Sequence, residues 1–488
     1  MELKEFTNQI LKLLNINTVN DIPEKLMQTI KKPKELKKFI KSYNQLLKKG
    51  TQDMDYLQGL YEFWLSNREE LSQDYTPQSL AKLVAMLSNH ENENTIYDMC
   101  CGMGSLTLAK HKSHEQCNYI LKELDQNVLP FLLFKLCYKQ INAKVYCEDV
   151  LTNEKKKTYI IRNGILINEL TLELDPTIDT VISNPPFNLR LDKPITCNNE
   201  TFEQQLNFAF IYKALEELSD DGVGVFILPS GVLSSSEEKK YRKYLVDNDL
   251  LDIVISVPGK MFANTSIPTT VIRVRKNKRD KRKGKVTFIK SAPTGLFERK
   301  QKGEDHMKTR VYTKTFLYYT DTDLLEIAEY IMDQKTEPEH CITVDIDTVK
   351  DKDYEISPSR YIPMKDIVDT SRSFKDIVND IKRCDTRRGL VKLTLNQTLA
   401  KSFDLELFEE HNKSSDAIFN SLRGLLKDNP DKMDDLTMED LDYTPLHYFQ
   451  LSKKKNEIKF EQNTKDTGIS EMFSIMMTLW IQNVKYVE

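Results

Sequence analysis

The feature that most constrains the fold is a regular alternation of short β-branched runs with helical segments between residues 75 and 275. Runs rich in Val, Ile and Thr are typical of buried strands, and apolar residues spaced three or four apart are typical of helices. Strands that alternate with helices form a doubly wound, largely parallel sheet. We therefore predict an α/β fold whose strands lie at Thr95–Met99, Asn118–Leu124, Lys144–Cys147, Thr180–Ser183, Val223–Leu228, Leu251–Val257 and Thr269–Val274.

Helical patterns flank this region on both sides. The sequence predicts a helical N-terminal domain over residues 1–70, an α/β core over 71–300, and a mostly helical C-terminal region over 301–488. Inside the core, Thr76 and Pro77 are expected to cap and start a helix. Apolar residues between Leu405 and Leu425 are expected to form helical faces that either dock a partner or pack on the core. Further elements are predicted at Val128–Gln140, Phe202–Leu218, Glu237–Val246, Lys285–Lys290 and Asp323–Met332.

Composition excludes several classes of protein. Hydrophobic residues make up 40% and charged residues 30% of the 488 residues, as in ordinary globular proteins. No apolar run reaches the roughly 20 residues that span a bilayer, and the charged start is not a secretory signal, so no membrane association is expected. The eight cysteines show no paired framework and no CxxC motif, which favours a cytoplasmic location and argues against a metal site.

A strand that runs into a glycine turn and then a helix is the first candidate binding feature. It is Ile96–Leu106, with Asp98 at the strand end and Gly102, Gly104 and Ser105 in the turn. Glycine lets a backbone bend sharply and approach a ligand without a Cβ in the way. The same pattern is also compatible with a plain tight turn.

Acidic residues follow at the ends of the next two strands. Glu123, with Asp125 as the alternative, lies about twenty residues after the glycines, where a nucleotide-type ligand presents its ribose hydroxyls. Asp149 ends the third strand and suits the amine of an adenine ring. Each acid alone is more typical of a surface or capping residue, but their order at successive strand ends favours a ligand site.

The most informative segment is Asn184-Pro185-Pro186-Phe187, at the end of a buried strand. Two prolines cannot continue a central strand, so the chain leaves the sheet rigidly. An amine conjugated to a ring is a poor nucleophile. If the Asn184 oxygen and the Pro185 carbonyl accept its hydrogens, its nitrogen can become pyramidal and attack a methyl donor. Phe187 can stack on a flipped-out base.

A dense run of basic residues lies between Arg273 and Arg310. Such a run is either a solvated surface loop or a patch that contacts phosphates. The run alone does not establish nucleic-acid binding.

Together these segments resemble N6-adenine DNA methyltransferases, and especially the modification subunits of type I restriction–modification systems. The resemblance covers residues 55–365 and includes Phe226–Leu233, Val257–Thr270 and Ile356–Tyr361. It implies a Rossmann-like methyltransferase core that uses S-adenosyl-L-methionine. The implied catalytic residues are Asn184, Pro185, Pro186 and Phe187, and the implied cofactor-binding residues are Tyr75, Thr76, Pro77, Asp98, Gly102, Gly104, Ser105, Glu123 and Asp149. Met99 and Met103 depart from the family pattern and affect the expected cofactor affinity.

The resemblance also implies the reaction and the partners. The expected reaction is methyl transfer to the N6 amine of adenine in duplex DNA, by a chain that works with a DNA-specificity subunit, a second copy of itself and a nuclease–translocase restriction subunit. Planar amines in RNA and in protein glutamine fit the same segment, so methylation of these substrates is an alternative. A self-sufficient enzyme that reads its site with residues 375–488 is another. A catalytically silent DNA-binding scaffold is the third, although the intact Asn184–Phe187 segment argues against it.

Overall fold

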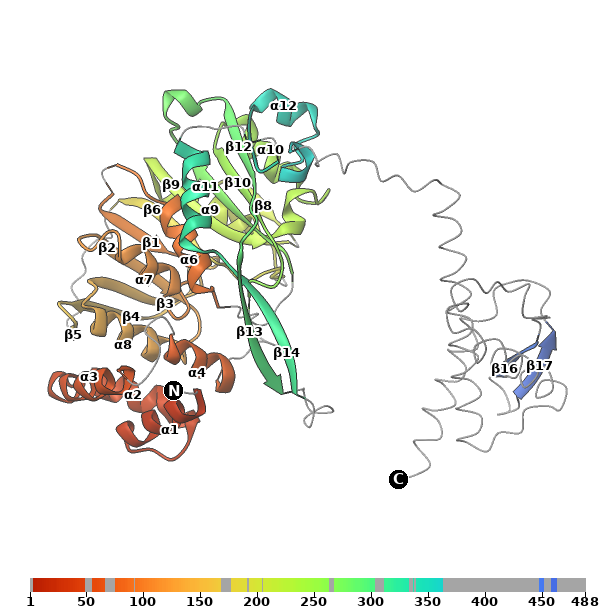
Figure 1. Cartoon of the computed structure of the whole chain (residues 1–488). Helices are drawn as coiled ribbons and strands as arrows, with labels where there is room; N and C mark the ends of the chain where they lie inside the picture. The colour runs from red at the N-terminus through yellow and green to blue at the C-terminus, as the bar shows by residue number, and fades with distance from the viewer. Residues whose placement is uncertain are drawn as a thin grey trace. The chain divides into compact units, whose positions relative to one another are not determined.

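The computed structural model describes most of the chain up to residue 362 and two strands near its end (Figure 1). It describes residues 3–48, 55–65, 75–91, 93–167, 177–190, 193–203, 205–262, 267–302, 311–332, 337, 339–362, 447–451 and 458–462. The chain divides into two compact units, Met1–Lys365 and Asp366–Glu488. Among the described residues, no helix is both long and apolar enough to cross a bilayer.

Four amphipathic helices open the first unit and pack on the core. They are α1 (Leu3–Leu14), α2 (Ile22–Ile30), α3 (Pro33–Leu47) and α4 (Tyr56–Trp64), with a short 3₁₀ turn at Val19–Asp21. The ring centroids of Phe39 and Tyr43 on α3 each lie 5.1 Å from that of Phe134 on α8 (Leu129–Lys139), in edge-on contacts. The N-terminal helices therefore share one hydrophobic core with the rest of the unit.

All seven predicted strands occur in one large sheet, and Lys285–Lys290 adds β12. Eleven described strands lie in the order β15-β12-β10-β11-β9-β6-β1-β2-β3-β4-β5. The middle of the sheet is parallel, whereas β11 runs antiparallel to both of its neighbours. The central strands are β1 (Thr95–Asp98), β2 (Asn118–Glu123), β3 (Ala143–Glu148), β6 (Ile178–Ser183), β9 (Leu218–Pro229), β10 (Leu251–Val257) and β11 (Thr269–Arg275).

Helices cover both faces of the sheet and create two hydrophobic clusters. One cluster lies under α6 (Gln78–Leu87), α7 (Ser105–His111) and α8, and the other under α9 (Ala209–Glu217) and α10 (Lys239–Asp247). Helix α9 is shorter than predicted: it begins only at Ala209, and a small hairpin of β7 (Ile195–Cys197) and β8 (Glu200–Phe202) lies before it. The α/β expectation is thus confirmed.

The predicted cap of α6 is wrong. Pro77 occupies the cap position with φ −61° and ψ 146°, and no side chain caps the helix. The Thr76 hydroxyl instead contacts a side chain 108 residues away, at the end of β6.

The sheet continues past residue 300, where the sequence placed the end of the core. Strand β15 pairs with β12 at the edge of this sheet, whereas β13 and β14 pair with each other in a separate, long two-stranded hairpin (Figure 1). Charged and polar residues interrupt the apolar residues of β13 and β14, so these two strands lack the apolar runs that predict a strand, whereas the short β-branched run of β15 was not predicted. The other elements are β4 (Lys155–Arg162), β5 (Ile165–Ile167), β13 (Gly295–Lys302), β14 (Val311–Tyr318), α11 (Asp321–Met332), β15 (Cys341–Asp345), α12 (Ile346–Asp351) and 3₁₀ turns at Ser230–Leu233, Asp280–Arg282 and Pro358–Arg360.

In the second unit, the described residues form the antiparallel pair β16 (His447–Leu451) and β17 (Ile458–Gln462). This pair lies within the predicted helical region. The apolar faces predicted between Leu405 and Leu425 lie outside the described residues.

Much of the basic run serves the core rather than the surface. Asp252 is fully buried, and its two carboxylate oxygens bind Arg273 at 3.0 Å and Arg282 at 2.6 Å. Burial acts to raise the pKa of Asp252, but these two guanidinium groups hold it below its usual value. Lys278 is buried and pairs with Asp249 at 2.6 Å. At these positions the basic side chains form neither a solvated surface loop nor a patch that contacts phosphates, the two roles predicted from the sequence.

Candidate functional site

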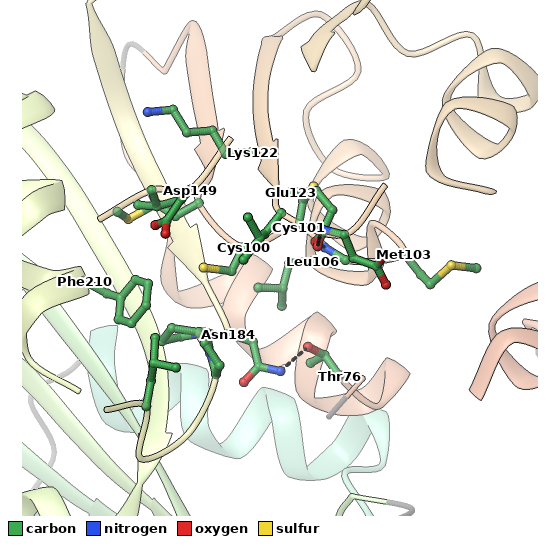
Figure 2. Close-up of a pocket in the computed structure, with 18 of the residues that line it drawn as sticks. Thr76, Cys100, Cys101, Met103, Leu106, Lys122, Glu123, Asp149, Asn184 and Phe210 are labelled. Carbon is green, nitrogen blue, oxygen red and sulfur yellow. Dashed lines mark hydrogen bonds between the residues drawn. The ribbon is translucent and has the colours of Figure 1, made fainter. Parts of the chain in front are cut away.

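A cavity lies where the carboxyl ends of β1, β2, β3 and β6 meet (Figure 2). This is the edge at which parallel α/β sheets bind ligands. Ten of the predicted site residues line the cavity: Tyr75, Thr76, Gly102, Ser105, Glu123, Asp149, Asn184, Pro185, Pro186 and Phe187. Pro77, Asp98 and Gly104 are not among its lining residues.

The glycine turn after β1 is held by hydrogen bonds from both sides. Gly102 has φ +50°, and its amide donates to Glu123 Oε2 at 2.7 Å. Gly104 has φ +78° and donates to the Cys101 carbonyl at 2.7 Å. A Cβ on Gly104 would lie 2.8 Å from a methyl of Leu132 on α8, so close packing requires glycine there. The two glycines therefore differ: Gly102 faces the cavity and Gly104 faces the helix behind it.

Asp98 ends β1 beneath this turn and is completely buried. Its Oδ2 accepts a hydrogen bond of 2.7 Å from the Thr107 hydroxyl on α7. Burial raises the pKa of Asp98 to about 7, although the Thr107 bonds lower it. Its contact ties the strand end to α7, which supports the shape of the turn.

Glu123 ends β2 and is turned toward the glycine loop (Figure 2). One carboxylate oxygen accepts from Gly102 and the other accepts from the Asp125 amide at 2.8 Å. Burial raises the pKa of Glu123 to about 7, against the effect of these amide donors. A carboxyl with a pKa near neutrality can gain or lose its proton when a ligand binds.

Asp149 follows β3 on the far side of the cavity. Its Oδ1 accepts from the Leu151 amide at 2.9 Å and from the Thr152 amide at 3.3 Å, which fixes its own turn. The neighbouring Glu148 binds Lys122 at 3.1 Å, and Lys122 lies over the Tyr97 ring. Lys122 and Glu148 also line the cavity, although neither was predicted as a site residue.

The Asn-Pro-Pro-Phe segment follows β6 directly. The Asn184 side-chain nitrogen donates to Thr76 Oγ1 at 3.0 Å (Figure 2). The half-buried Phe187 ring meets the edge of the buried Phe262, with centroids 5.9 Å apart and planes at 81°. An amide and an aromatic ring are thus both fixed at the cavity wall.

Helix α4 supports the site through contacts that were not predicted from the sequence. Gln58 Oε1 accepts from the Ser105 hydroxyl at 2.7 Å, and the Tyr61 hydroxyl donates to Asp125 Oδ2 at 2.8 Å. Lys135 of α8 adds a third link, because it binds Asp55 at 2.5 Å and the Met103 carbonyl at 3.1 Å. In the sequence, these contacts could have been suspected from the polar residues that interrupt the otherwise apolar segment of α4.

Known proteins with similar sequences are methylase subunits of restriction enzymes. The chain is 26% identical over 328 residues to the type I restriction enzyme MjaVIII methylase subunit of Methanocaldococcus jannaschii, covering 63% of this chain and 53% of that protein. It is 25% identical over 353 residues to the type I restriction enzyme MpnII methylase subunit of Mycoplasma pneumoniae, covering 63% of this chain and 60% of that protein. The chain thus spans little more than half the length of these relatives.

A solved structure shows the same fold. The type I restriction-modification system methyltransferase subunit from Streptococcus thermophilus superposes with a TM-score of 0.50 and 21% identity, covering 74% of this chain and 77% of that one. The N-6 DNA Methylase family model matches residues 52–370, which contain both the glycine turn and the Asn-Pro-Pro-Phe segment. The chain therefore belongs to the N-6 DNA methylase family.

Proposed function

We propose that this chain transfers a methyl group from S-adenosylmethionine to the N6 amine of adenine in DNA. The observation that carries the proposal is that the Asn184–Phe187 segment and the Gly102 turn, 82 residues apart in sequence, line one cavity. Membership of the N-6 DNA methylase family and the names of the relatives support it.

The side chains of the cavity fit such a cofactor. Glu123 and Asp149 place carboxylates at two strand ends, suited to ribose hydroxyls and to an adenine amine. Leu124 and Val150 add apolar surface for a base, and Gly102 allows close backbone approach. These residues, with Tyr75 and Ser105, would hold S-adenosylmethionine. When bound, the cofactor supplies an electrophilic methyl group on a sulfonium centre.

The protein's own contribution is to prepare the amine. Adenine N6 is a weak nucleophile because its lone pair is shared with the ring. The Asn184 carbonyl oxygen and the Pro185 carbonyl oxygen accept its two hydrogens, which favours a pyramidal nitrogen with a localised lone pair. The Phe187 ring stacks on the flipped base and is held by Phe262 behind it.

A chemical test compares substrates directly. Purified protein, co-expressed with a specificity subunit, is incubated with labelled S-adenosylmethionine and duplex DNA, RNA or a glutamine peptide, and the methylated products are identified by mass spectrometry. We expect N6-methyladenine to form in the DNA, and no methylation of the RNA or the glutamine peptide. Asn184→Ala should lower turnover by at least about a hundredfold, as for other removed electrostatic groups, with cofactor affinity little changed. Asn248→Ala, an amide at the end of α10, is the control.

Phe187→Ala should mainly weaken the hold on the flipped base, by about 1–3 kcal/mol. Methyl transfer to RNA or glutamine, or an active Asn184→Ala variant, would contradict the proposal.

We also propose that the chain acts as the modification subunit of a type I complex, with a DNA-specificity subunit and a second copy of itself on duplex DNA. A restriction subunit would then supply cleavage. The names of the curated relatives support this assignment. The test is methylation of genomic DNA with and without a co-expressed specificity subunit. Site-specific methylation by the chain alone would favour the self-sufficient enzyme instead.

A further inference from the structure

We propose that Thr76 is a positioning residue for Asn184, whose amide it orients for catalysis. The inference rests on the proposed function, because it concerns the same amine. The Asn184 side-chain nitrogen donates to Thr76 Oγ1 at 3.0 Å (Figure 2). The two residues lie on separate elements, one before α6 and the other after β6.

The local backbone leaves the Thr76 hydroxyl available for this role. Helix α6 begins at Gln78, and Pro77 precedes it in an extended conformation with no side-chain cap. The Thr76 side chain, only 6% exposed, is therefore directed across the cavity wall rather than onto the helix end. The rigid φ of Pro77 restricts the backbone next to it.

An asparagine amide has two chemically opposite ends. Its NH₂ group only donates hydrogen bonds and its carbonyl oxygen only accepts them. The substrate amine presents hydrogens, so catalysis requires the oxygen end. In the structure Nδ2 is the end bound to Thr76, so the oxygen end of the amide is directed away from that hydroxyl, and we assign this end to the amine. If the amide turned over, a donor would face a donor.

This role differs from the contact with cofactor that the sequence resemblance implied for Thr76. A cofactor contact would appear in the affinity for S-adenosylmethionine. An orienting contact would appear in kcat, because the amide acts on the amine in the transition state. The two roles therefore predict different kinetic signatures for one substitution.

The experiment compares Thr76→Val, which keeps the shape and loses the hydroxyl, with Thr76→Ser, which keeps the hydroxyl. For Val we expect kcat to fall roughly three- to tenfold, the effect of one lost neutral hydrogen bond. The dissociation constant for S-adenosylmethionine, measured by calorimetry without DNA, should change less than about twofold. Ser should restore most of kcat. Thr29→Val is a matched control, because Thr29 is also 6% exposed and binds only a carbonyl within α2.

Three results would overturn the inference. They are an unchanged kcat in Thr76→Val, an equal loss in the Val and Ser variants, and weaker cofactor binding with normal kcat. Thr76→Ala provides the same comparison if Val does not fold, as judged by melting temperature against Thr29→Val. Failure of the proposed function is separate, because it would appear as wild-type protein that does not methylate adenine in DNA even with a specificity subunit present.

Discussion

Replacing Gly104 by alanine should destabilise the fold much more than replacing Gly102. Both glycines have positive φ, +50° for Gly102 and +78° for Gly104, and alanine in that region costs about 1–2 kcal/mol. Their surroundings differ. A Cβ on Gly102 would lie 3.5 Å from the Tyr75 ring, an ordinary contact, whereas one on Gly104 would lie 2.8 Å from Leu132. Leu132 is fully buried and cannot move aside freely.

Overpacking of this kind costs a further 1–3 kcal/mol, approximately, so Gly104→Ala should lose about 2–5 kcal/mol and Gly102→Ala about 1–2 kcal/mol. The unfolding entropy is about 2.1 cal/mol/K per residue. Over the unit Met1–Lys365 this gives melting temperatures lowered by about 3–6 °C and about 1–3 °C.

The assay is differential scanning fluorimetry, together with calorimetry of S-adenosylmethionine binding. Gly102→Ala should affect cofactor affinity more than Gly104→Ala does, because only Gly102 lines the cavity. In Leu132→Ala protein, Gly104→Ala should cost less than it does alone. Equal melting temperatures for the two glycine variants would refute the steric reasoning.

Three other expectations concern Glu123, helix α4 and the buried arginines. Burial raises the pKa of Glu123 to about 7, and an ionised carboxylate is the better acceptor for ribose hydroxyls. Cofactor affinity measured by calorimetry should therefore rise between about pH 6 and 8. Glu123→Gln should flatten that rise. An identical pH profile in Glu123→Gln would contradict the assignment. Tyr61→Phe removes one hydrogen bond to the buried Asp125 carboxylate and should lower stability by about 1–3 kcal/mol, with weaker cofactor binding in the same protein. An unchanged melting temperature would argue against this brace. Arg282→Gln leaves Asp252 with one guanidinium partner and should cost about 3 kcal/mol by thermal unfolding, whereas a neutral effect would mean that this ion pair contributes little.

The sequence alone determined the order of the strands along the chain and the segments that carry chemistry. Apolar β-branched runs are local signals, so β1 to β3, β6 and β9 to β12 were predicted within a few residues. Glycine and proline act on the backbone through their own geometry. For that reason the turn at Gly102 and the break at Pro185 were also evident from the residues themselves.

Only the tertiary structure decided which side chains meet. Thr76 and Asn184 are 108 residues apart, and no local pattern assigns the Thr76 hydroxyl to that amide rather than to α6. Likewise Gly104 proved to pack on Leu132, and a run of basic residues proved to neutralise the buried Asp252. A residue's type limits the bonds it can form. The partner that is present is set by how distant strands and helices pack, because burial makes an unmade contact costly.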